Sequence, residues 1–457
     1  MAIADAITAL KAAMGDKIST SPSDTALHGQ SESHFAPMAP DAVAYPACTQ
    51  DVADIVRICA DHHCPVIGFG VGTSLEGQTS AKRGGVSVDF RDMAAVLESA
   101  DADMYARVQP GITREGLNTE LRHTGLMFPV DPGANATLGG MASTRASGTT
   151  AVRYGTMRDN VLGLEVVTAD GTILRTGTRA RKSAAGYDLT ALFVGAEGTL
   201  GLITELTLRL HGQPEATAAA VCAFDDMEAA VQAVTATIQC GIPMARIEFV
   251  DGATALAFNA YANTDMPEKP HLLVEFHGSE SGVKEQSETF GEIVADFGGA
   301  DFQWTVQPED RARLWAMRHN AYYAILSSRP GARALVTDLC VPMSKLAAAV
   351  EETRADIATS PIPGPIIGHV GDGNFHAILL MDPDNPAEKE AALALSSRMV
   401  ERALAMGGTV TGEHGVGLGK LDHMDAEHGA AWGIMGQIKR ALDPHDIMNP
   451  GKLVRLN

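Results

Sequence analysis

Apolar residues recur along the first part of the chain at two different spacings. Val52, Ile55, Val56 and Cys59 follow the i, i+3, i+4, i+7 spacing of an amphipathic helix. Short runs rich in β-branched and aromatic residues predict strands at 65–67, 86–90, 106–111, 164–168 and 202–210. We therefore expect both helices and strands in this part of the chain, and the regular alternation that follows it indicates an α+β class.

The pattern becomes more regular after Gln213-Pro214, where strands and helices alternate. Predicted strands lie at 218–224, 246–250, 272–276 and 302–306, and predicted helices lie at 226–239 and 283–297. Such an order is similar to two ferredoxin-like halves with antiparallel neighbouring strands. We therefore expect a second domain that begins near residue 213.

Runs of glycine and other small residues separate the predicted elements of the first half. They lie at Gly68–Ser74, between Pro132 and Gly148, and at Gly195–Gly201. Glycine lets the backbone approach a bulky anion, and successive N–H groups can bind phosphate. The first run lacks the lysine of a P-loop, and it does not open the long helix of a Rossmann fingerprint. Each run alone is also typical of a coil without function, but together they favour loops around a large planar or phosphorylated ligand.

Two histidines lie on a predicted hairpin, Gly368–His376, with Asp372 and Gly373 as its turn residues. A two-residue turn pairs His369 directly with His376, and opposed residues share a face with Cβ atoms about 4.5–5.5 Å apart. Two imidazoles at that separation can bind one metal ion. The run Thr411–Gly415 offers a carboxylate and a third imidazole, and we expect the two runs to meet.

A predicted helix from Glu309 to Ser327 places Trp315, Arg318 and Tyr322 on one stripe. A guanidinium between two aromatic rings suits a carboxylate-binding wall, because it binds a carboxylate bidentately. The alternative is an arginine whose stem lies along the core while its head reaches water.

Charge and composition narrow the classes of function. The net charge of −21 over 457 residues argues against nucleic acid or an anionic membrane surface as a partner. No Cys-x-x-Cys pair occurs, so free thiols in a reducing compartment are expected. We read no signal peptide in residues 1–18, and no transit peptide because arginines are missing there. No run approaches the roughly 18–20 apolar residues that a spanning helix needs. We therefore expect a cytoplasmic protein, at most peripheral to a membrane.

Five motifs, in order along the chain, carry a family resemblance. They are Gly68–Ser74, Gly195–Gly201 with Ile203-Thr204-Glu205, Gly368–His376, Thr411–Gly415 and Asn449-Pro450-Gly451-Lys452. Over residues 40–455 the chain resembles the D-2-hydroxyacid dehydrogenases of the vanillyl-alcohol-oxidase (VAO) type, flavoproteins with a PCMH-type FAD domain. Cytochrome-linked D-lactate dehydrogenases are the most similar branch, beside glycolate oxidase subunits and D-2-hydroxyglutarate dehydrogenases.

The resemblance implies a two-subdomain FAD-binding domain at 1–212, a ferredoxin-like cap domain at 213–420 and a C-terminal helical segment at 421–457 that packs back on the FAD domain. It implies FAD held without a covalent bond, because Thr73-Ser74-Leu75 contains no histidine for attachment. The implied FAD-binding residues are Gly68, Phe69, Gly70, Val71, Gly72, Thr73, Ser74, Pro132, Gly133, Thr137, Gly139, Gly140, Ser143, Ser147, Gly148, Glu197, Gly198, Ile203 and Asn449.

The resemblance also assigns roles in the second domain. His369, His376 and Glu413 would bind one divalent metal ion, zinc or manganese; His414 would be the catalytic base, and Arg318 would bind the substrate carboxylate. The hydroxyglutarate branch has a lysine at the position of Val336 and an asparagine at that of Ile378. With Trp315 and Tyr322, these two residues would line an apolar pocket that suits a small or apolar D-2-hydroxyacid.

The implied reaction is oxidation of D-lactate to pyruvate by hydride transfer to the flavin. Electrons would pass to cytochrome c, an electron-transfer flavoprotein or a quinone, and a homodimer is left open. Glycolate and D-2-hydroxyglutarate are alternative substrates. A flavin-free metal hydrolase would leave the glycine runs without a role, and a third alternative is a protein that binds FAD or metal without catalysis.

Overall fold

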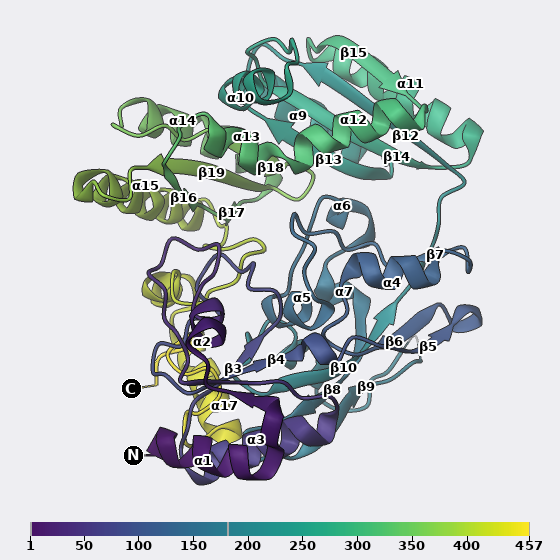
Figure 1. The fold of residues 1–457 in the computed structure, drawn as a ribbon. Helices are drawn as coiled ribbons and strands as arrows, with labels where there is room; N and C mark the ends of the chain where they lie inside the picture. Colours follow the sequence, from purple (N-terminus) through teal and green to yellow (C-terminus); the bar gives the residue numbers. More distant parts are fainter. Residues whose placement is uncertain (1, 181, 457) are drawn as a thin grey trace. The chain divides into compact units, whose positions relative to one another are not determined.

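The chain divides into two compact units in the computed structural model, which describes residues 2–180 and 182–456. The first unit comprises Met1–Ser147, Gly155–Gln213 and Glu413–Asn457, and the second comprises Gly148–Tyr154 and Pro214–Gly412. Helices and β-sheets occur in both units (Figure 1), which confirms the predicted α+β class.

A small sheet in the first unit has the strand order β1-β2-β4-β3. Its members are β1 (Ile18–Ser19), β2 (Ala42–Ala44), β4 (Val86–Asp89) and β3 (Val66–Phe69), with β4 parallel to both β2 and β3. Helix α3 (Thr49–Asp61) packs on this layer together with α1 (Ala2–Met14). The predicted stripe of α3, from Val52 to Cys59, is fully buried in their shared core, which confirms the amphipathic helix.

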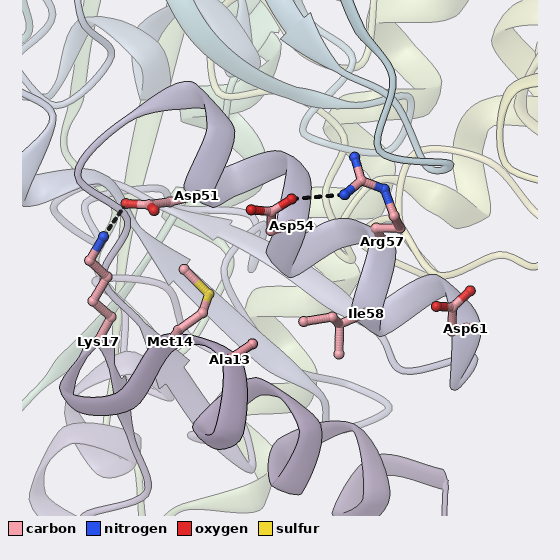
Figure 2. Close-up of a pocket in the computed structure, with 8 residues that line it drawn as sticks. All are labelled: Ala13, Met14, Lys17, Asp51, Asp54, Arg57, Ile58 and Asp61. Carbon is pink, nitrogen blue, oxygen red and sulfur yellow. Dashed lines mark hydrogen bonds and ion pairs between the residues drawn. The ribbon is translucent and has the colours of Figure 1, made fainter.

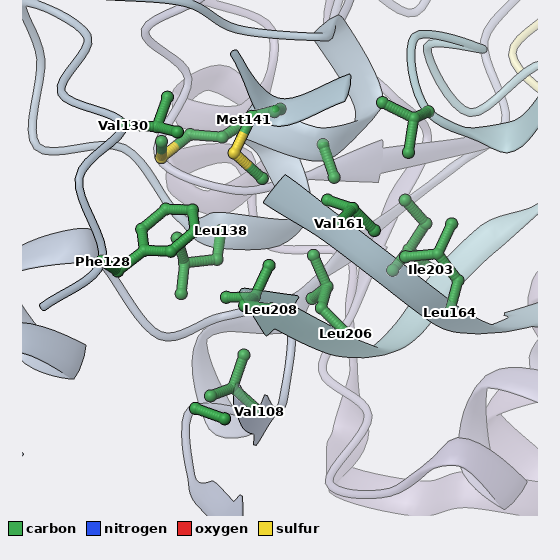
Figure 3. Packing of buried hydrophobic residues seen from close by; sticks show 14 of the residues in the cluster. Val108, Phe128, Val130, Leu138, Met141, Val161, Leu164, Ile203, Leu206 and Leu208 are labelled. Carbon is green, nitrogen blue, oxygen red and sulfur yellow. The ribbon is translucent and has the colours of Figure 1, made fainter. Parts of the chain in front are cut away.

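An antiparallel sheet with the order β5-β6-β10-β8-β9 forms the rest of the first unit's framework. Its strands are β5 (Val96–Ala100), β6 (Tyr105–Val108), β10 (Leu202–Arg209), β8 (Val161–Val167) and β9 (Ile173–Gly177). Alternate residues such as Leu206 and Leu208 pack with Leu138 and Met141 of α5 (Leu138–Thr144), as Figure 3 shows. Shorter elements complete the unit: α2 (Pro22–His28), α4 (Arg114–Leu121), β7 (Leu126–Met127), α7 (Met157–Asn160), α8 (Leu189–Phe193), β11 (His211–Gly212), α16 (Met424–His428) and α17 (Ala430–Leu442).

The second unit is built on one long sheet with the order β15-β12-β14-β13-β18-β19-β16. Its first four members are β15 (Ala300–Thr305), β12 (Ala216–Ala223), β14 (His271–Gly278) and β13 (Met244–Val250), all antiparallel to their neighbours. Helices α9 (Met227–Gln239), α10 (Gly252–Ala262) and α11 (Glu280–Asp296) connect them. This order is that of a complete ferredoxin-like half.

The other half of this sheet is built from β16 (Arg333–Val336), β17 (Leu339–Cys340), β18 (Ile366–His369) and β19 (Asn374–Met381), with α14 (Met343–Ala358) and α15 (Pro386–Ala405). In place of a fourth strand it has a single bridge between Cys340 and Thr409. The pairing of β13 with β18 joins the halves into one sheet. The short helix α6 (Ala151–Tyr154), from the first half of the sequence, also belongs to this unit.

Helices α10, α12 (Pro308–His319) and α13 (Ala321–Ser327) pack on the sheet face that carries Val250 and Ile378. The prediction of one helix from Glu309 to Ser327 is wrong, because α12 ends at His319 and α13 begins at Ala321, with Asn320 between them. Asn320 donates its side-chain amide to Ala316 O, 2.8 Å away, and this local bond competes with helical continuation. Trp315 and Arg318 therefore lie on α12, whereas Tyr322 lies on α13.

Candidate active site

The glycine-rich runs of the first unit come together around α5. A Cβ atom at Gly70 would overlap Thr137 Oγ1, so the loop after β3 can approach the start of α5 only because residue 70 is glycine. At the other end of α5, Gly195 N donates to Ala142 O at 2.9 Å and Glu197 N donates to Ser143 O at 2.8 Å. Three of the predicted cofactor-binding runs thus lie against one helix. Gly148 belongs to the segment assigned to the second unit.

The C-terminal motif lies beside the same loops. Residues 447–449 run along β3, with Asn449 N donating to Val66 O at 2.8 Å. The Asn449 side chain donates to Glu197 O at 2.7 Å and to Gln78 O at 3.0 Å. Asn449, predicted as a cofactor residue, is therefore adjacent to two of the predicted cofactor loops.

The loops fit a phosphate-bearing cofactor. Within residues 2–180 and 182–456, Ser74 Oγ and Thr79 Oγ1 are buried hydroxyl groups with no hydrogen-bond partner in the protein. Buried polar groups are ordinarily paired, and phosphate oxygens would supply acceptors. Ser74 ends the predicted pyrophosphate loop, so its unpaired hydroxyl supports FAD at that position.

The segment that follows Gly412 is fixed to this framework by two side chains. Gln78 Nε2 donates to His414 O at 2.7 Å, and the Glu197 carboxylate accepts from Val416 N at 2.6 Å and Gly417 N at 2.8 Å. Gly415 has a positive φ of 81°, and a Cβ there would overlap Glu197 Oε1. The turn after His414 is therefore built tightly against Gln78 and Glu197.

The buried groups of this network have displaced pKa values. Burial raises the pKa of the Glu197 carboxyl to about 7, although the N–H groups of Val416 and Gly417 pull the other way. Burial likewise lowers the pKa of Lys452 to about 7, against the attraction of Glu197. Lys452 donates to Ser80 O and to Asn449 Oδ1, both at 2.5 Å.

The hairpin of the second unit has a longer turn than predicted. His369 pairs with Asn374, and His376 pairs with Ile367, so residues 370–373 form a four-residue loop. Direct opposition of the two histidines is therefore wrong. His369 faces Asn374 instead of His376, so the pairing is shifted by two residues along β19. Because side chains alternate between the two faces with a period of two, both histidines still lie on the same face. Their ring centroids lie 5.6 Å apart.

Both imidazoles are anchored through Nδ1. His369 Nδ1 lies 2.7 Å from Glu248 Oε1, and His376 Nδ1 lies 2.9 Å from Thr337 O. An imidazole that donates from Nδ1 carries its lone pair on Nε2, the nitrogen offered to a metal ion. Ligating atoms of the two rings lie within 4.8 Å of one another. The histidine pair therefore fits a divalent metal ion.

Glu248 is a residue that sequence reasoning missed. It lies on β13, its side chain is fully buried, and its second oxygen lies 2.6 Å from Arg318 Nη2. The alternation of charged and apolar residues in Arg246-Ile247-Glu248-Phe249 was the available signal, since it places a carboxylate on an inward face of a buried strand. Its partners, 70 or more positions away, could not be read from that pattern.

Two predicted pocket residues on α12 carry buried donors. Within the described part of the chain, Arg318 Nε and Trp315 Nε1 have no hydrogen-bond acceptor. Ile378 and Trp315 are buried in one apolar cluster, against which Val336 and Tyr322 pack in partly buried positions. The helix thus offers hydrogen-bond donors beside an apolar wall.

Glu413 and His414 begin the last segment of the first unit, directly after Gly412. Their side chains are neighbours, with His414 Nε2 3.9 Å from Glu413 Oε1. That these residues act together with His369 and His376 stays a prediction.

A surface hollow of about 340 Å³ lies elsewhere in the first unit, where α1 and Lys17 face α3 (Figure 2). Two ion pairs line it: Lys17 with Asp51 at 2.5 Å and Arg57 with Asp54 at 2.8 Å. None of the predicted site residues lines it, so we assign it no role.

The fold matches solved flavoprotein structures. P-cresol methylhydroxylase with substrate bound superimposes with a TM-score of 0.82 at 17% identity, covering 99% of this chain and 96% of that chain. A 4-ethylphenol oxidase from Gulosibacter chungangensis gives 0.79 at 20% identity, covering 99% and 97%. These solved structures thus share the two-domain α+β fold that the resemblance implied.

Sequence comparison identifies the family within that class. Residues 40–177 match the family described as FAD binding domain, and residues 213–453 match FAD linked oxidases, C-terminal domain. A probable mitochondrial D-lactate dehydrogenase of Danio rerio is 47% identical over 460 residues, covering 100% of this chain and 93% of that protein. A mitochondrial D-lactate dehydrogenase [cytochrome] of Arabidopsis thaliana is 42% identical over 451 residues, covering 98% and 80%. The chain therefore belongs to the FAD-linked oxidases, beside the D-lactate dehydrogenases, and is an FAD-dependent oxidoreductase.

A further relative is the glycolate oxidase subunit GlcD of Bacillus subtilis, 36% identical over 420 residues and covering 91% of this chain and 89% of that protein. Within the described residues, no helix combines the length and apolar character needed to cross a bilayer. The predicted cytoplasmic location is contradicted, because the relatives from Danio rerio and Arabidopsis thaliana are named mitochondrial. The prediction rested on missing targeting patterns, and a missing pattern does not identify a compartment.

Proposed function

We propose that this protein oxidises a D-2-hydroxyacid, D-lactate in the first place, to the 2-oxo acid. The observation that carries the proposal is the pair of buried donors, Arg318 Nε and Trp315 Nε1, which lack acceptors among the described residues. They share a unit with the metal-suited pair His369 and His376. A substrate carboxylate would satisfy the guanidinium, and its hydroxyl would meet the metal. The names of the relatives point to the same reaction.

The binding residues have separate tasks. Arg318 holds the substrate carboxylate and thereby fixes the orientation of Cα. His369 and His376, with Glu413 as third ligand, hold a zinc or manganese ion. When bound, that ion supplies a Lewis acid for the α-hydroxyl, and bound FAD supplies the acceptor for the Cα hydride. The residues of Gly68–Ser74, with the other predicted FAD residues of the first unit, hold the cofactor.

His414 is the proposed base that takes the hydroxyl proton. Gln78 holds its backbone carbonyl, and the turn at Gly415 packs against Glu197, so the backbone that carries the imidazole is fixed. A general base must sit within hydrogen-bond reach of its proton, so restricted movement favours the transfer.

Pocket polarity supports a small substrate. Val336 and Ile378 offer no partner to a second carboxylate, which disfavours D-2-hydroxyglutarate. Glycolate lacks only the methyl group of lactate and stays the nearest alternative, in keeping with the GlcD relative. A cytochrome is the proposed electron acceptor, as the Arabidopsis relative's name suggests.

Anaerobic reduction of the flavin tests the proposal. Purified protein should be yellow, and D-lactate should bleach it faster than L-lactate, glycolate or D-2-hydroxyglutarate. His414→Ala should keep the yellow colour and lose rapid bleaching. A protein that D-lactate leaves yellow refutes the proposed substrate, and full bleaching by a verified metal-free sample refutes the metal's role. Cytochrome c, a quinone analogue and an electron-transfer flavoprotein, offered separately to the reduced protein, identify the acceptor.

A further inference from the structure

Glu248 connects three elements of the second unit through one carboxylate. It lies on β13, while His369 comes from the adjacent strand β18 and Arg318 from α12. Oε1 lies 2.7 Å from His369 Nδ1, and Oε2 lies 2.6 Å from Arg318 Nη2. No part of the side chain reaches solvent. Each oxygen therefore serves a different proposed site residue.

The carboxylate determines how His369 is presented. Beside the arginine, an ionised carboxylate has only acceptor atoms, so the imidazole must donate its Nδ1 proton to it. This fixes the tautomer with its lone pair on Nε2. His376 donates to the carbonyl of Thr337, and Asp338 Oδ1 lies 3.7 Å from the same nitrogen. An anionic partner makes an imidazole a stronger ligand, and Glu248 provides that support to His369 at hydrogen-bond distance.

The same carboxylate also orients the guanidinium group of Arg318. A guanidinium is a rigid planar fork, so fixing Nη2 also fixes the direction of Nε. Arg318 Nε is buried and has no acceptor among the residues that the structure describes. The ion pair with Glu248 Oε2 thus holds the guanidinium in place and leaves Nε as a donor for an anionic group.

We propose that Glu248 is a positioning residue that aligns His369 for the metal ion and Arg318 for the substrate carboxylate. The inference rests on the proposed function, because it takes from there the tasks of His369 and Arg318. It predicts that one substitution weakens metal binding and substrate binding together, although Glu248 touches neither ligand.

Glu248→Gln tests this coupling, with Glu275→Gln as the matched control. The glutamine keeps the shape but has one acceptor oxygen and no charge, so it cannot both accept from His369 Nδ1 and form an ion pair with Arg318. Glu275 is also buried and also lies between an arginine, Arg246, and a histidine, His277. Affinity for Mn²⁺ alone is measured on substrate-free, FAD-loaded protein by the electron paramagnetic resonance signal of unbound Mn²⁺. KM and kcat for D-lactate are measured from the steady-state turnover of the FAD-loaded protein.

Glu248→Gln should lower Mn²⁺ affinity by about 10- to 100-fold and raise KM for D-lactate, while the flavin content stays that of wild type. Glu275→Gln should leave both binding quantities within about twofold while it lowers thermal stability. Glu248→Asp, which keeps the charge but shortens the reach, should give intermediate values and serves if the glutamine variant does not fold.

Equal losses of Mn²⁺ affinity in Glu248→Gln and Glu275→Gln would show a general packing effect and overturn the proposal. Wild-type affinity and KM in Glu248→Gln would overturn it as well, while leaving the proposed function intact. A wild-type protein that binds no Mn²⁺ and is not bleached by D-lactate refutes the proposed function, and the inference with it. The wild-type measurement therefore separates the two failures.

Discussion

Glu248 and Glu275 make the same kind of cluster on the same sheet, yet only one of them adjoins a predicted metal ligand. Glu248 lies between Arg318 and His369, and Glu275 lies between Arg246 and His277. The strands that carry them, β13 and β14, are neighbours. Composition and burial alone therefore do not distinguish a cluster beside a binding site from a cluster that only stabilises the fold.

The difference lies in how each histidine is used. His277 binds Glu275 through Nε2 at 2.8 Å and Tyr154 through Nδ1 at 2.7 Å, so protein groups occupy both ring nitrogens. His369 contacts Glu248 through Nδ1, and its ring lies beside that of His376, with ligating atoms of the two rings within 4.8 Å of one another. The Glu275 cluster ties α6 to the sheet, since Arg153 also donates to His277 O. One cluster is thus suited to a ligand, and the other joins two segments distant in sequence.

The largest contrast is expected between the two histidines. His369→Ala should lower Mn²⁺ affinity by more than about 100-fold, because it removes a ligand rather than a supporting group. His277→Ala should leave that affinity unchanged and cost about 1–3 kcal/mol of unfolding free energy, because Glu275 and Tyr154 lose a buried partner. Mn²⁺ titration and urea unfolding measure the two quantities. Loss of Mn²⁺ affinity in both variants would remove the distinction between the clusters.

Replacing the arginines should give the next largest contrast. Arg318→Lys exchanges a planar fork for a point charge, so KM for D-lactate should rise by roughly 30- to 100-fold, the equivalent of about 2–3 kcal/mol for a charged hydrogen bond. Arg246→Lys loses the stacking on Trp315, where the guanidinium lies 4.7 Å from the ring centre, and should act mainly on stability. Steady-state kinetics and thermal unfolding separate the effects. The comparison fails if Arg246→Lys raises KM as much as Arg318→Lys.

A smaller effect is expected from Tyr154→Phe. The substitution removes one hydrogen bond to His277 and should lower the unfolding free energy by about 1 kcal/mol. Bleaching by D-lactate, followed by stopped flow, should keep its wild-type rate. A tenfold slower reduction would place the Glu275 cluster in the chemistry and contradict its supporting role.

The smallest effect is expected for the pH dependence of the stability that Glu275 contributes. Burial raises the pKa of Glu275, but the hydrogen bond from His277 and the charge of Arg246 outweigh it and hold the pKa below the ordinary 4.5. The unfolded chain then binds this proton more readily, so the stabilisation is present above pH 4.5 and is lost as the pH falls through the lowered value. The difference in unfolding free energy between wild type and Glu275→Gln should therefore shrink as the pH is lowered from about 6 to about 3. If this difference stays constant over the pH range, ionisation of Glu275 does not contribute to stability.

Much of the fold followed from local patterns. The stripe from Val52 to Cys59 and the strand–helix alternation after residue 213 required only periodicity, which local packing sets. The break at Asn320 did not follow, because a single side chain competing with the helix is a weak signal in a long apolar stripe. The four-residue loop at 370–373 was missed for a similar reason, since Asp-Gly also favours a two-residue turn.

By itself, the sequence determined that two histidines share a face, that glycine-rich loops are grouped, and that an arginine lies near aromatic rings. These features depend on spacing, and the face of a strand survives a register change of two residues. Only the tertiary structure decided that Glu248 serves His369 and Arg318, while Glu275 serves His277. That choice depends on β13 lying between β14 and β18, and the pairing of β13 with β18 joins segments more than a hundred residues apart in the chain.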